Sequence, residues 1–246
     1  MKIKNIALVG NPNCGKTSLF NTLTGTRQKV ANYAGVTVER KEGSFNLPSG
    51  DAIRVLDLPG TYSLKPSSLD EEVTRAVCLG ELKGEILPDI FICVVDATNL
   101  SLHLSLVLEV RALNRPMILV LNMMDEVKKR GISIDKDKLS QLLGIPVVEA
   151  VAVKTKGIQD LINQLDQKNL FITPYHSELS HFEQVKQITK QVILNNDNGD
   201  KRTAFLDKIF LHPVLGLVIL TLTMFVMFQA VFIWATPVSY THLTLP

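Results

Sequence analysis

The sequence predicts an α/β fold in which a mostly parallel sheet carries helices on both faces. Apolar runs alternate with helical patterns from the start of the chain to about Ile162, which is the order of parallel strands joined by crossover helices. The first apolar run, Ile3–Val9, leads directly into the glycine-containing stretch Gly10–Ser18. A strand, a glycine loop and a helix in this order form an anion-binding turn, so we expect the fold to be organised around that loop.

Each element has its own apolar pattern. The expected strands are Ile3–Val9, Gly43–Leu47, Ala52–Leu56, Ile90–Asp96, Met117–Asn122 and Ile145–Glu149. The expected helices are Lys16–Thr24, Leu69–Leu82, Leu102–Leu113, Asp137–Leu143 and Ile158–Leu165. The second and third strands are joined by Leu47–Asp51, which contains Pro and Gly and is typical of a hairpin. The sheet is therefore expected to have six strands, one of them an antiparallel edge strand.

The stretch Gly10–Ser18 contains the phosphate-loop pattern Gly10-x4-Gly15-Lys16-Thr17. Glycine lets the backbone approach phosphate oxygens closely, and the helix start adds positive potential. We expect Lys16 to bind the β- and γ-phosphates, and the Thr17 hydroxyl to bind Mg²⁺. The loop residues expected to bind nucleotide are Gly10, Asn11, Pro12, Asn13, Cys14, Gly15, Lys16, Thr17 and Ser18. The alternative is a strand-to-helix turn that binds nothing.

Further motifs follow in the order that a GTPase requires. Thr37, within Gly35-Val36-Thr37, lies in a long loop and is expected to close onto Mg²⁺ and a γ-phosphate. Asp57 ends a strand, where its carboxylate can hold Mg²⁺ through water, and the Gly60 N–H can meet the γ-phosphate. Each signal alone is weak, because a carboxylate at a strand end is usually a cap. Their order makes them strong evidence for a Ras-like P-loop GTPase.

Two later motifs predict recognition of the base. In Asn122-Met123-Met124-Asp125, the Asp125 carboxylate would accept two hydrogen bonds from guanine, a pattern that adenine cannot offer. The stretch Val151-Ala152-Val153 follows the sixth expected strand, where the Ala152 N–H would meet the guanine O6. GTP and GDP are therefore the expected ligands.

Composition bounds the remaining possibilities. The chain has 246 residues and a net charge of +2, which is too small to indicate a nucleic-acid-binding surface. Its three cysteines share no metal-type spacing and give no disulfide framework, which suits a reducing compartment. We expect a GTP-binding domain over residues 1–166 and a short helical linker over 167–204. In the linker, Ser180 and Glu183 form a capping box before a helix with Phe182, Val185, Ile188 and Val192 on one face.

Residues 205–238 are expected to form a juxtamembrane segment and a transmembrane helix. Val214–Thr236 carries no charge, and about 20 such residues span a bilayer core. Lys201, Arg202 and Lys208 precede it, which predicts a cytoplasmic N-terminal side. The alternative is a buried core helix of a larger soluble domain. One such helix encloses no path for a solute, so we expect a truncated membrane protein; residues 239–246 show no pattern that continues the helix and are expected to be a non-native tail.

The amino-acid sequences of these motifs resemble those of the ferrous iron transport protein B (FeoB) family. The resemblance covers roughly residues 1–165 and resumes at Phe205–Pro237. The stretches that carry it are Gly10–Asn13, Gly35–Glu39, Asp57–Ser63 and Val95–Leu100, and then Asp207–Ile209 and Leu211–Gly216. The resemblance implies a bacterial inner-membrane Fe²⁺ importer whose cytoplasmic GTPase gates or drives uptake. It also implies a small cytoplasmic partner protein of the same transport system, and it leaves a homo-oligomer open.

The resemblance further implies a K⁺ ion held by Asn13 beside the phosphates, in the place of an arginine finger. The other reading of Asn13 is a turn-capping side chain. The residues then expected to act in catalysis are Asn13, Lys16, Thr37 and Gly60, with Thr17, Thr37 and Asp57 as Mg²⁺ ligands. Thr61 stands where many GTPases carry glutamine, so hydrolysis is expected to be slow.

Three departures from the family pattern affect this reading. Val151-Ala152 replaces Ser-Ala, and Tyr33-Ala34 replaces Trp-Pro, which predicts a more mobile loop. The segment after the GTP-binding domain is shorter than the family's helical domain. Cys14 lies at a helix N-terminus beside Lys16, an environment that lowers a thiol pKa, although packing against the nucleotide is favoured over a redox role. His212 is read as an interfacial residue rather than a metal ligand.

The function predicted from the sequence is the slowly hydrolysing GTPase part of an iron importer, unable to transport by itself. Two alternatives stay open. A soluble GTPase of ribosome or RNA maturation shares the motif order, but it would carry a basic appendage where this chain is apolar. A membrane-tethered guanine-nucleotide switch that recruits partners without hydrolysis is not separated by sequence from slow hydrolysis.

Overall fold

The computed structural model describes residues 4–25, 28–150, 155–166, 179–195 and 201–243. It divides the chain into two compact units, residues 1–197 and residues 198–246. The first unit is built on a seven-stranded sheet in the order β2-β3-β4-β1-β5-β6-β8. Its strands are β1 (Asn5–Gly10), β2 (Gln28–Asn32), β3 (Glu39–Asn46), β4 (Ala52–Asp57), β5 (Ile90–Asp96), β6 (Met117–Asn122) and β8 (Val147–Glu149).

The predicted fold class is confirmed, and the sheet has one strand more than expected. From β4 to β8 all neighbours are parallel, whereas β2 and β3 are antiparallel. The additional strand is β2, which lies in the stretch expected to be a loop before Thr37. Every side chain of β2 is exposed, so it has no apolar pattern, and only its backbone pairing with β3 makes it a strand. Strand β3 begins at Glu39, four residues before the expected start at Gly43, because its first residues pair with β2 through the backbone.

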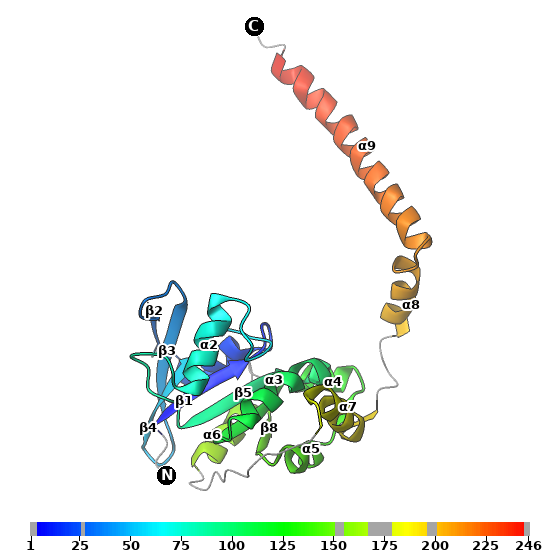
Figure 1. Cartoon of the computed structure of the whole chain (residues 1–246). Helices are drawn as coiled ribbons and strands as arrows, with labels where there is room; N and C mark the ends of the chain where they lie inside the picture. Colours follow the sequence, from blue (N-terminus) through cyan, green and yellow to red (C-terminus); the bar gives the residue numbers. More distant parts are fainter. Residues whose placement is uncertain (1–3, 26–27, 151–154, 167–178, 196–200, 244–246) are drawn as a thin grey trace. The chain divides into compact units, whose positions relative to one another are not determined.

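Helices cover both faces of the sheet (Figure 1). They are α1 (Lys16–Thr24), α2 (Leu69–Leu79), α3 (Leu100–Ala112), α4 (Met124–Lys129), α5 (Lys136–Leu143), α6 (Thr155–Asp166) and α7 (His181–Val192), with a 3₁₀ turn at Ala97–Asn99. One apolar cluster joins the sheet to α2, α3, α5 and α7, and a second joins it to α1 and α6. Strand β5 is buried on both faces: Phe91 and Cys93 enter the first cluster, and Ile92 and Val94 the second.

Helix α7 adds to the first core. Its capping box between Ser180 and Glu183 is confirmed, and it packs on α3 and α5. Of the four apolar residues expected on one face, Val185, Ile188 and Val192 are buried, but Phe182 is 77% exposed. Phe182 occupies the first turn, beyond the surface that α3 and α5 offer. After α7, β9 (Ile193–Asn195) pairs with β7 (Ser133–Ile134) in a small separate sheet. The expected domain boundary at residue 166 stays a prediction.

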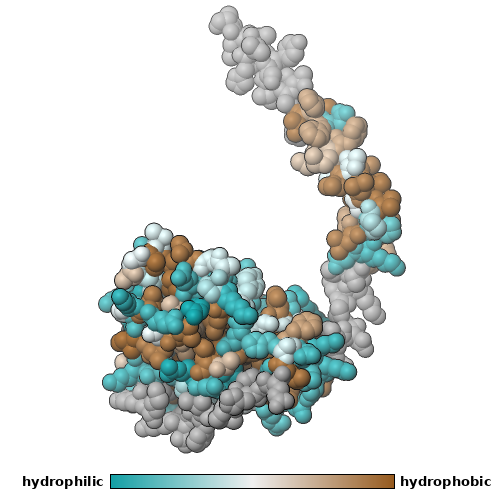
Figure 2. Space-filling view, in the orientation of Figure 1, coloured by the Kyte–Doolittle hydropathy of each residue, from teal (hydrophilic) through white to brown (hydrophobic). Residues whose placement is uncertain are grey.

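The second unit consists of α8 (Lys201–Phe210) and α9 (Leu215–Leu243). Within α9, the 19 residues Leu215–Ile233 are long and apolar enough to cross a membrane, and none of that window is buried. Figure 2 shows this apolar surface along the helix. The Thr221 and Thr223 hydroxyls donate to backbone oxygens one turn earlier, so these polar groups are satisfied within the helix.

Two details of α9 add to the sequence analysis, and the second corrects it. The Nδ1 atom of His212 accepts hydrogen bonds from the backbone N–H groups of Val214 and Leu215, so His212 caps the start of the helix. The helix also continues beyond Pro237 to Leu243, where no continuation was expected. Proline removes one hydrogen bond from a helix but does not have to end it, and no glycine or second proline follows before Leu243.

Replacement of Ile188 tests the packing of α7. Ile188→Ala should lower the free energy of unfolding by about 2–5 kcal/mol, because it leaves a cavity under α7. Phe182→Ala is the matched control on the same helix and should change it by less than about 0.5 kcal/mol. Both free energies of unfolding are measured by urea unfolding of the chain in mild detergent, with the reactivity of the buried cysteines as the signal. Equal effects of the two variants would contradict this packing.

Candidate functional site

The phosphate loop joins the end of β1 to the start of α1. Gly15 has φ = 87° and Asn13 has φ = 63°, so both lie in the left-handed region that turns the chain back on itself. A Cβ atom on Gly15 would lie 2.0 Å from the Nδ2 atom of Asn122. A Cβ on Gly10 would lie 2.4 Å from the carbonyl oxygen of Val94. Glycine is therefore required at both positions by close neighbours, not only by the motif.

Lys16 and Thr17 meet Asp57 at the open end of this loop. The Lys16 ammonium donates to Asp57 Oδ1 at 2.7 Å, and the Thr17 hydroxyl donates to Asp57 Oδ2 at 3.1 Å. Lys16 is 8% exposed and Asp57 is 5% exposed. The three side chains that the sequence assigns to phosphate and Mg²⁺ are thus in direct contact, although 40 residues or more separate Asp57 from the other two.

Asn122 braces the loop from the neighbouring part of the sheet. It ends β6, and its side-chain Nδ2 donates to the carbonyl oxygen of Cys14 at 2.9 Å. The sequence assigned Asn122 to nucleotide binding, and the structure shows what else it does: it ties the base motif to the phosphate loop. Met123 follows with φ = 62° and caps α4, whose first turn contains Asp125. A left-handed residue here turns the chain so that α4 starts at the edge of the sheet.

Two adjoining cavities lie along this edge, and Lys16, Thr17, Gly60 and Asp70 line both. The larger, about 610 Å³, runs along the phosphate loop and is also lined by Asn11, Pro12, Asn13, Gly15, Ser18 and Met123. The smaller, about 250 Å³, is also lined by Val38, Glu39, Lys41, Asp57, Leu58 and Pro59. Most of the expected phosphate and magnesium residues are therefore gathered, and Glu39, Lys41 and Asp70 join them without having been predicted.

The other expected site residues stand apart from these cavities. Gly10 and Cys14 belong to the buried base of the loop, and Asp125 and the segment Gly35–Thr37 line neither cavity. Thr37 is exposed, so its contact with Mg²⁺ and a γ-phosphate stays a prediction. Val151, Ala152 and Val153 lie outside the described residues.

Tyr33 fastens the loop that carries Thr37. Its backbone N–H donates to Val38 O at 3.0 Å, and its carbonyl oxygen accepts from Val36 N–H at 3.2 Å. The Tyr33 ring is 2% exposed, and burial raises the pKa of its hydroxyl. A buried aromatic ring thus anchors the base of this loop, and the mobility predicted from the missing Trp-Pro stays a prediction.

The segment after Gly60 is held by two carboxylates. The Thr61 side chain is fully buried; its hydroxyl donates to Ser63 O at 2.6 Å and lies 3.2 Å from Glu71 Oε1. Glu109 accepts from the Ser63 hydroxyl at 2.9 Å. Hydrogen bonds from the backbone and side chain of Ser67 lower the pKa of Glu71. Thr61 lines neither cavity, and the slow hydrolysis expected from a threonine at this position stays a prediction.

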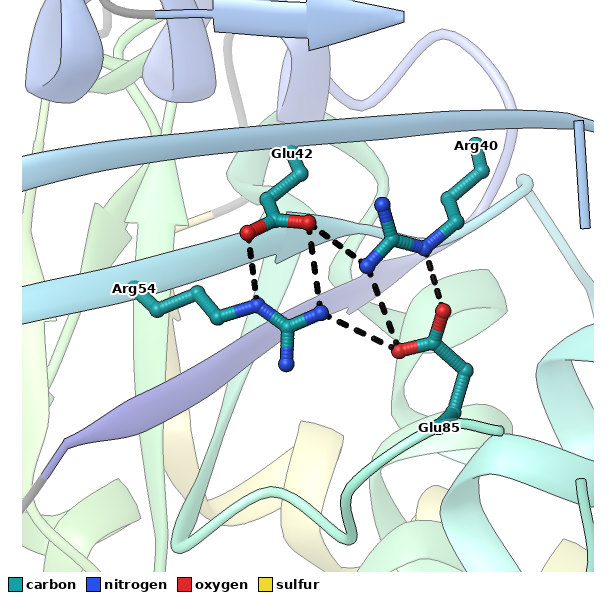
Figure 3. A network of polar contacts seen from close by, with 4 residues as sticks. All are labelled: Arg40, Glu42, Arg54 and Glu85. Carbon is teal, nitrogen blue, oxygen red and sulfur yellow. Dashed lines mark hydrogen bonds and ion pairs between the residues drawn. The ribbon is translucent and has the colours of Figure 1, made fainter. Parts of the chain in front are cut away.

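A network of four charges braces β3 from the face opposite the cavities (Figure 3). Arg54 Nε donates to Glu42 Oε1 at 2.7 Å, and Arg40 lies 2.6 Å from Glu42 Oε2. Both arginines also pair with Glu85, which lies between α2 and β5. Hydrogen bonds from Arg54 lower the pKa of Glu42. Since each charge has two opposite neighbours and all four are partly buried, the network fixes β3 against β4 and the Glu85 segment.

Cys14 corrects a sequence expectation. The helix start and Lys16 were expected to lower its thiol pKa, but Cys14 is fully buried, and desolvation raises that pKa to about 11. Lys16 acts in the expected direction but is outweighed by burial. Cys14 packs in the apolar cluster beneath α1 and is not poised for redox chemistry.

The oxygen atoms at the site suit a hard cation. The Asp57 carboxylate and the Thr17 hydroxyl lie 3.1 Å apart on one cavity wall, which is the donor set that Mg²⁺ prefers beside phosphates. Within the part of the chain that the structure describes, no group of three or more His, Cys, Asp or Glu residues is arranged to hold a metal ion by itself. A metal here would complete its coordination with oxygen atoms from water or from a bound ligand.

Comparison with protein families gives a match over most of the first unit. The profile of the family described as ferrous iron transport protein B matches residues 4–165. The Fe(2+) transporter FeoB of Salmonella typhimurium is 46% identical over 188 residues, and that of Escherichia coli K12 is 45% identical over the same length. These alignments cover 75% of this chain but only 23% of each transporter.

Solved structures of similar proteins agree with the fold. The cytosolic domain of L. pneumophila FeoB superposes with a TM-score of 0.71 at 32% identity, covering 78% of this chain and 100% of that one. The cytosolic domain of T. maritima FeoB in its GMPPNP form gives a TM-score of 0.66 at 34% identity, covering 78% and 100%. A GDP form of the same T. maritima domain gives 0.67 at 33% identity, covering 78% and 99%.

The burial of Cys14, Cys78 and Cys93 predicts slow thiol chemistry. With its pKa raised to about 11, roughly a thousandth of Cys14 is ionised at pH 8, and the pKa of Cys78 is raised further, to about 12. An aromatic disulfide reagent should therefore label none of the three within minutes at pH 8, and all three after denaturation, as counted by intact mass. Rapid labelling of one thiol in the native chain would show that the thiol is accessible and its pKa low.

Proposed function

The chain belongs to the ferrous iron transport protein B family, and from this premise we propose that its first unit binds GTP and hydrolyses it slowly to GDP and phosphate. The contact of Lys16 and Thr17 with Asp57 on the wall of the two cavities carries the proposal. This contact brings the Lys16 ammonium, which can bind phosphate, next to the Thr17 and Asp57 oxygens, which can bind Mg²⁺, at the N-terminus of α1. The related T. maritima domain is described in GMPPNP and GDP forms.

Thr17 and Asp57 would hold Mg²⁺ in this reaction, and Thr37 would join them when a γ-phosphate is bound. Bound Mg²⁺ neutralises the charge that builds on the phosphate oxygens. The chain's own part is to orient the phosphates. Lys16 binds the β- and γ-phosphates, and the N–H of Gly60, which lines both cavities, meets the γ-phosphate. Close packing supports this placement of Gly60, because a Cβ atom there would lie 3.1 Å from the backbone nitrogen of Pro12.

Guanine is the base that Asp125 favours. Asn122 and Met123 place α4 at the end of the larger cavity, and Asp125 lies in its first turn. Its carboxylate would accept two hydrogen bonds from the guanine edge, and we assign the backbone N–H of Ala152, which lies outside the described residues, to the guanine O6. The tie from Asn122 to the phosphate loop supports this arrangement, because it sets the distance between base and phosphate recognition.

Potassium is the second proposed cation. Asn13 is exposed on the larger cavity, and its left-handed backbone places it at the turn of the phosphate loop. A carboxamide oxygen there can hold K⁺ where other GTPases use an arginine finger. Among the described residues no arginine lines either cavity, so K⁺ would stand where other GTPases place an arginine.

In the whole protein, this unit would gate or drive Fe²⁺ uptake across the bacterial inner membrane. The alignment covers 23% of the length of the curated transporters that the chain matches, and in this proposal the ion path would belong to the remaining part of such a transporter. The apolar helix α9 supports contact with the lipid bilayer, with the first unit in the cytoplasm. A small cytoplasmic partner protein and a homo-oligomer belong to the same proposal.

Replacement of Asp125 tests the proposed ligand. Asp125→Asn should weaken GTP binding by at least about a hundredfold, because two charge-assisted hydrogen bonds are lost, and should favour xanthosine triphosphate instead. Glu126→Gln is the matched control one residue later, where the carboxylate pairs with Lys129 and Arg130, and it should bind GTP normally. Titration with fluorescent nucleotides measures both. If ATP competes as well as GTP for the unaltered chain, the base assignment fails.

Replacement of Asn13 tests the potassium site. In related enzymes a positive charge supplied at the transition state is worth about 10³–10⁵-fold in rate, so K⁺ should stimulate hydrolysis where Na⁺ does not. Asn13→Ala should abolish that difference and still bind GTP. Phosphate release in the two salts at matched ionic strength measures it. Equal rates for the unaltered chain would remove K⁺ from the mechanism.

A further inference from the structure

Lys41 enters the smaller cavity from β3. Successive side chains of a strand point to opposite faces, and the two sides of β3 have different surroundings. Glu39 and Lys41 line the cavity together with Lys16 and Thr17, and Phe45, further along the same face, packs in the cluster beneath α1. Arg40 and Glu42 point to the other face, into the charge network. The cavity face of β3 thus presents a basic side chain to the phosphate site.

The register of the sheet sets Lys41 beside the magnesium end of that site. Lys41 is the antiparallel partner of Asp57 in β4, and Asp57 contacts both Lys16 and Thr17. The smaller cavity includes Asp57 and Gly60 but not Met123, which lines the larger cavity at the base end. Lys41 therefore lies at the end of the site that a third phosphate would occupy.

The Lys41 ammonium pairs with Glu39 Oε2, at 3.1 Å. The two side chains are 35% and 55% exposed, so the pair is largely hydrated and weak. Glu39 and Asp70 line the same cavity, and their carboxylates would repel a triphosphate. A lysine that leaves Glu39 for a phosphate loses little and offsets this repulsion.

The backbone at Lys41 is held by contacts on the face of β3 opposite the cavity. Arg40 and Glu42 flank it in the chain, and both are held by Arg54 and Glu85 on the opposite face (Figure 3). These contacts hold the backbone of Lys41 in register while its four-carbon side chain stays free to reach into the cavity.

We propose that Lys41 is a second phosphate-binding lysine, which exchanges Glu39 for the γ-phosphate and so distinguishes a nucleoside triphosphate from a diphosphate. This inference rests on the proposed function and goes beyond it, because the phosphate loop alone engages both nucleotides through Lys16. A diphosphate has no group at the Lys41 end of the site, so Lys41 should affect only the triphosphate.

The test compares two lysines on neighbouring strands. Lys41→Gln, in the full chain in mild detergent with Mg²⁺, should weaken binding of a non-hydrolysable GTP analogue by about tenfold to a hundredfold and leave GDP within about twofold. Lys29→Gln on β2 removes the same charge from an exposed residue outside both cavities, and should change neither affinity. Lys41→Arg should restore much of the analogue binding. Glu39→Gln should raise analogue affinity and leave GDP unchanged.

Four results would overturn the proposal. In Lys41→Gln, the first is an equal loss of affinity for the analogue and for GDP, and the second is an unchanged affinity for the analogue. The third is that Lys29→Gln weakens analogue binding as much as Lys41→Gln does. The fourth is tighter Mg²⁺-dependent binding of the analogue in Lys41→Gln, which would mean that Lys41 repels the metal. Protection of the three buried cysteines confirms that each variant is folded. If the unaltered chain binds neither nucleotide, the proposed function itself fails; if it binds both and Lys41→Gln behaves as the unaltered chain, only this inference does.

Discussion

Burial of Lys16 against Asp57 is the contact on which the site depends. The lysine and the aspartate are each less than a tenth exposed, and separating them would leave an uncompensated buried charge. The pair requires the ends of β1 and β4 to lie side by side. Their parallel register, with Leu8 opposite Asp57, meets that requirement. The order of strands in the sheet is thus tied directly to the chemistry at its edge.

The segments around this contact are held more firmly than loops of their sequence suggest. Tyr33 buries its ring beneath the loop that carries Thr37, and Glu71 contacts Thr61 after the Asp57 strand. Strand β3 is held by charges on one face and presents Lys41 to the cavity on the other. Hydrogen bonds, burial and ion pairs therefore anchor the backbone on several sides of the phosphate site, whereas Thr37 is exposed.

The second unit follows different physical rules. In α9 the apolar side chains are exposed and the polar hydroxyls of Thr221 and Thr223 are satisfied inside the helix, the reverse of the first unit. Such a surface is stable in lipid and unfavourable in water. His212 supplies the start signal for this helix through its ring nitrogen, so its role is explained without a metal.

The sequence by itself determined the features that rest on local patterns. These are the phosphate loop, the buried parallel strands from β4 to β8, the capping box of α7 and the apolar helix α9, because hydrophobic period, glycine spacing and capping residues are written in adjacent positions. Only the tertiary structure decided the rest. Strand β2 is defined by its backbone pairing with β3, and Phe182 is exposed although it shares the periodicity of the buried residues of α7. At Cys14, burial outweighs the effect of Lys16 on the thiol pKa. The tie from Asn122 to Cys14 and the placement of Lys41 join residues far apart in the chain, and no local pattern encodes contacts of that kind.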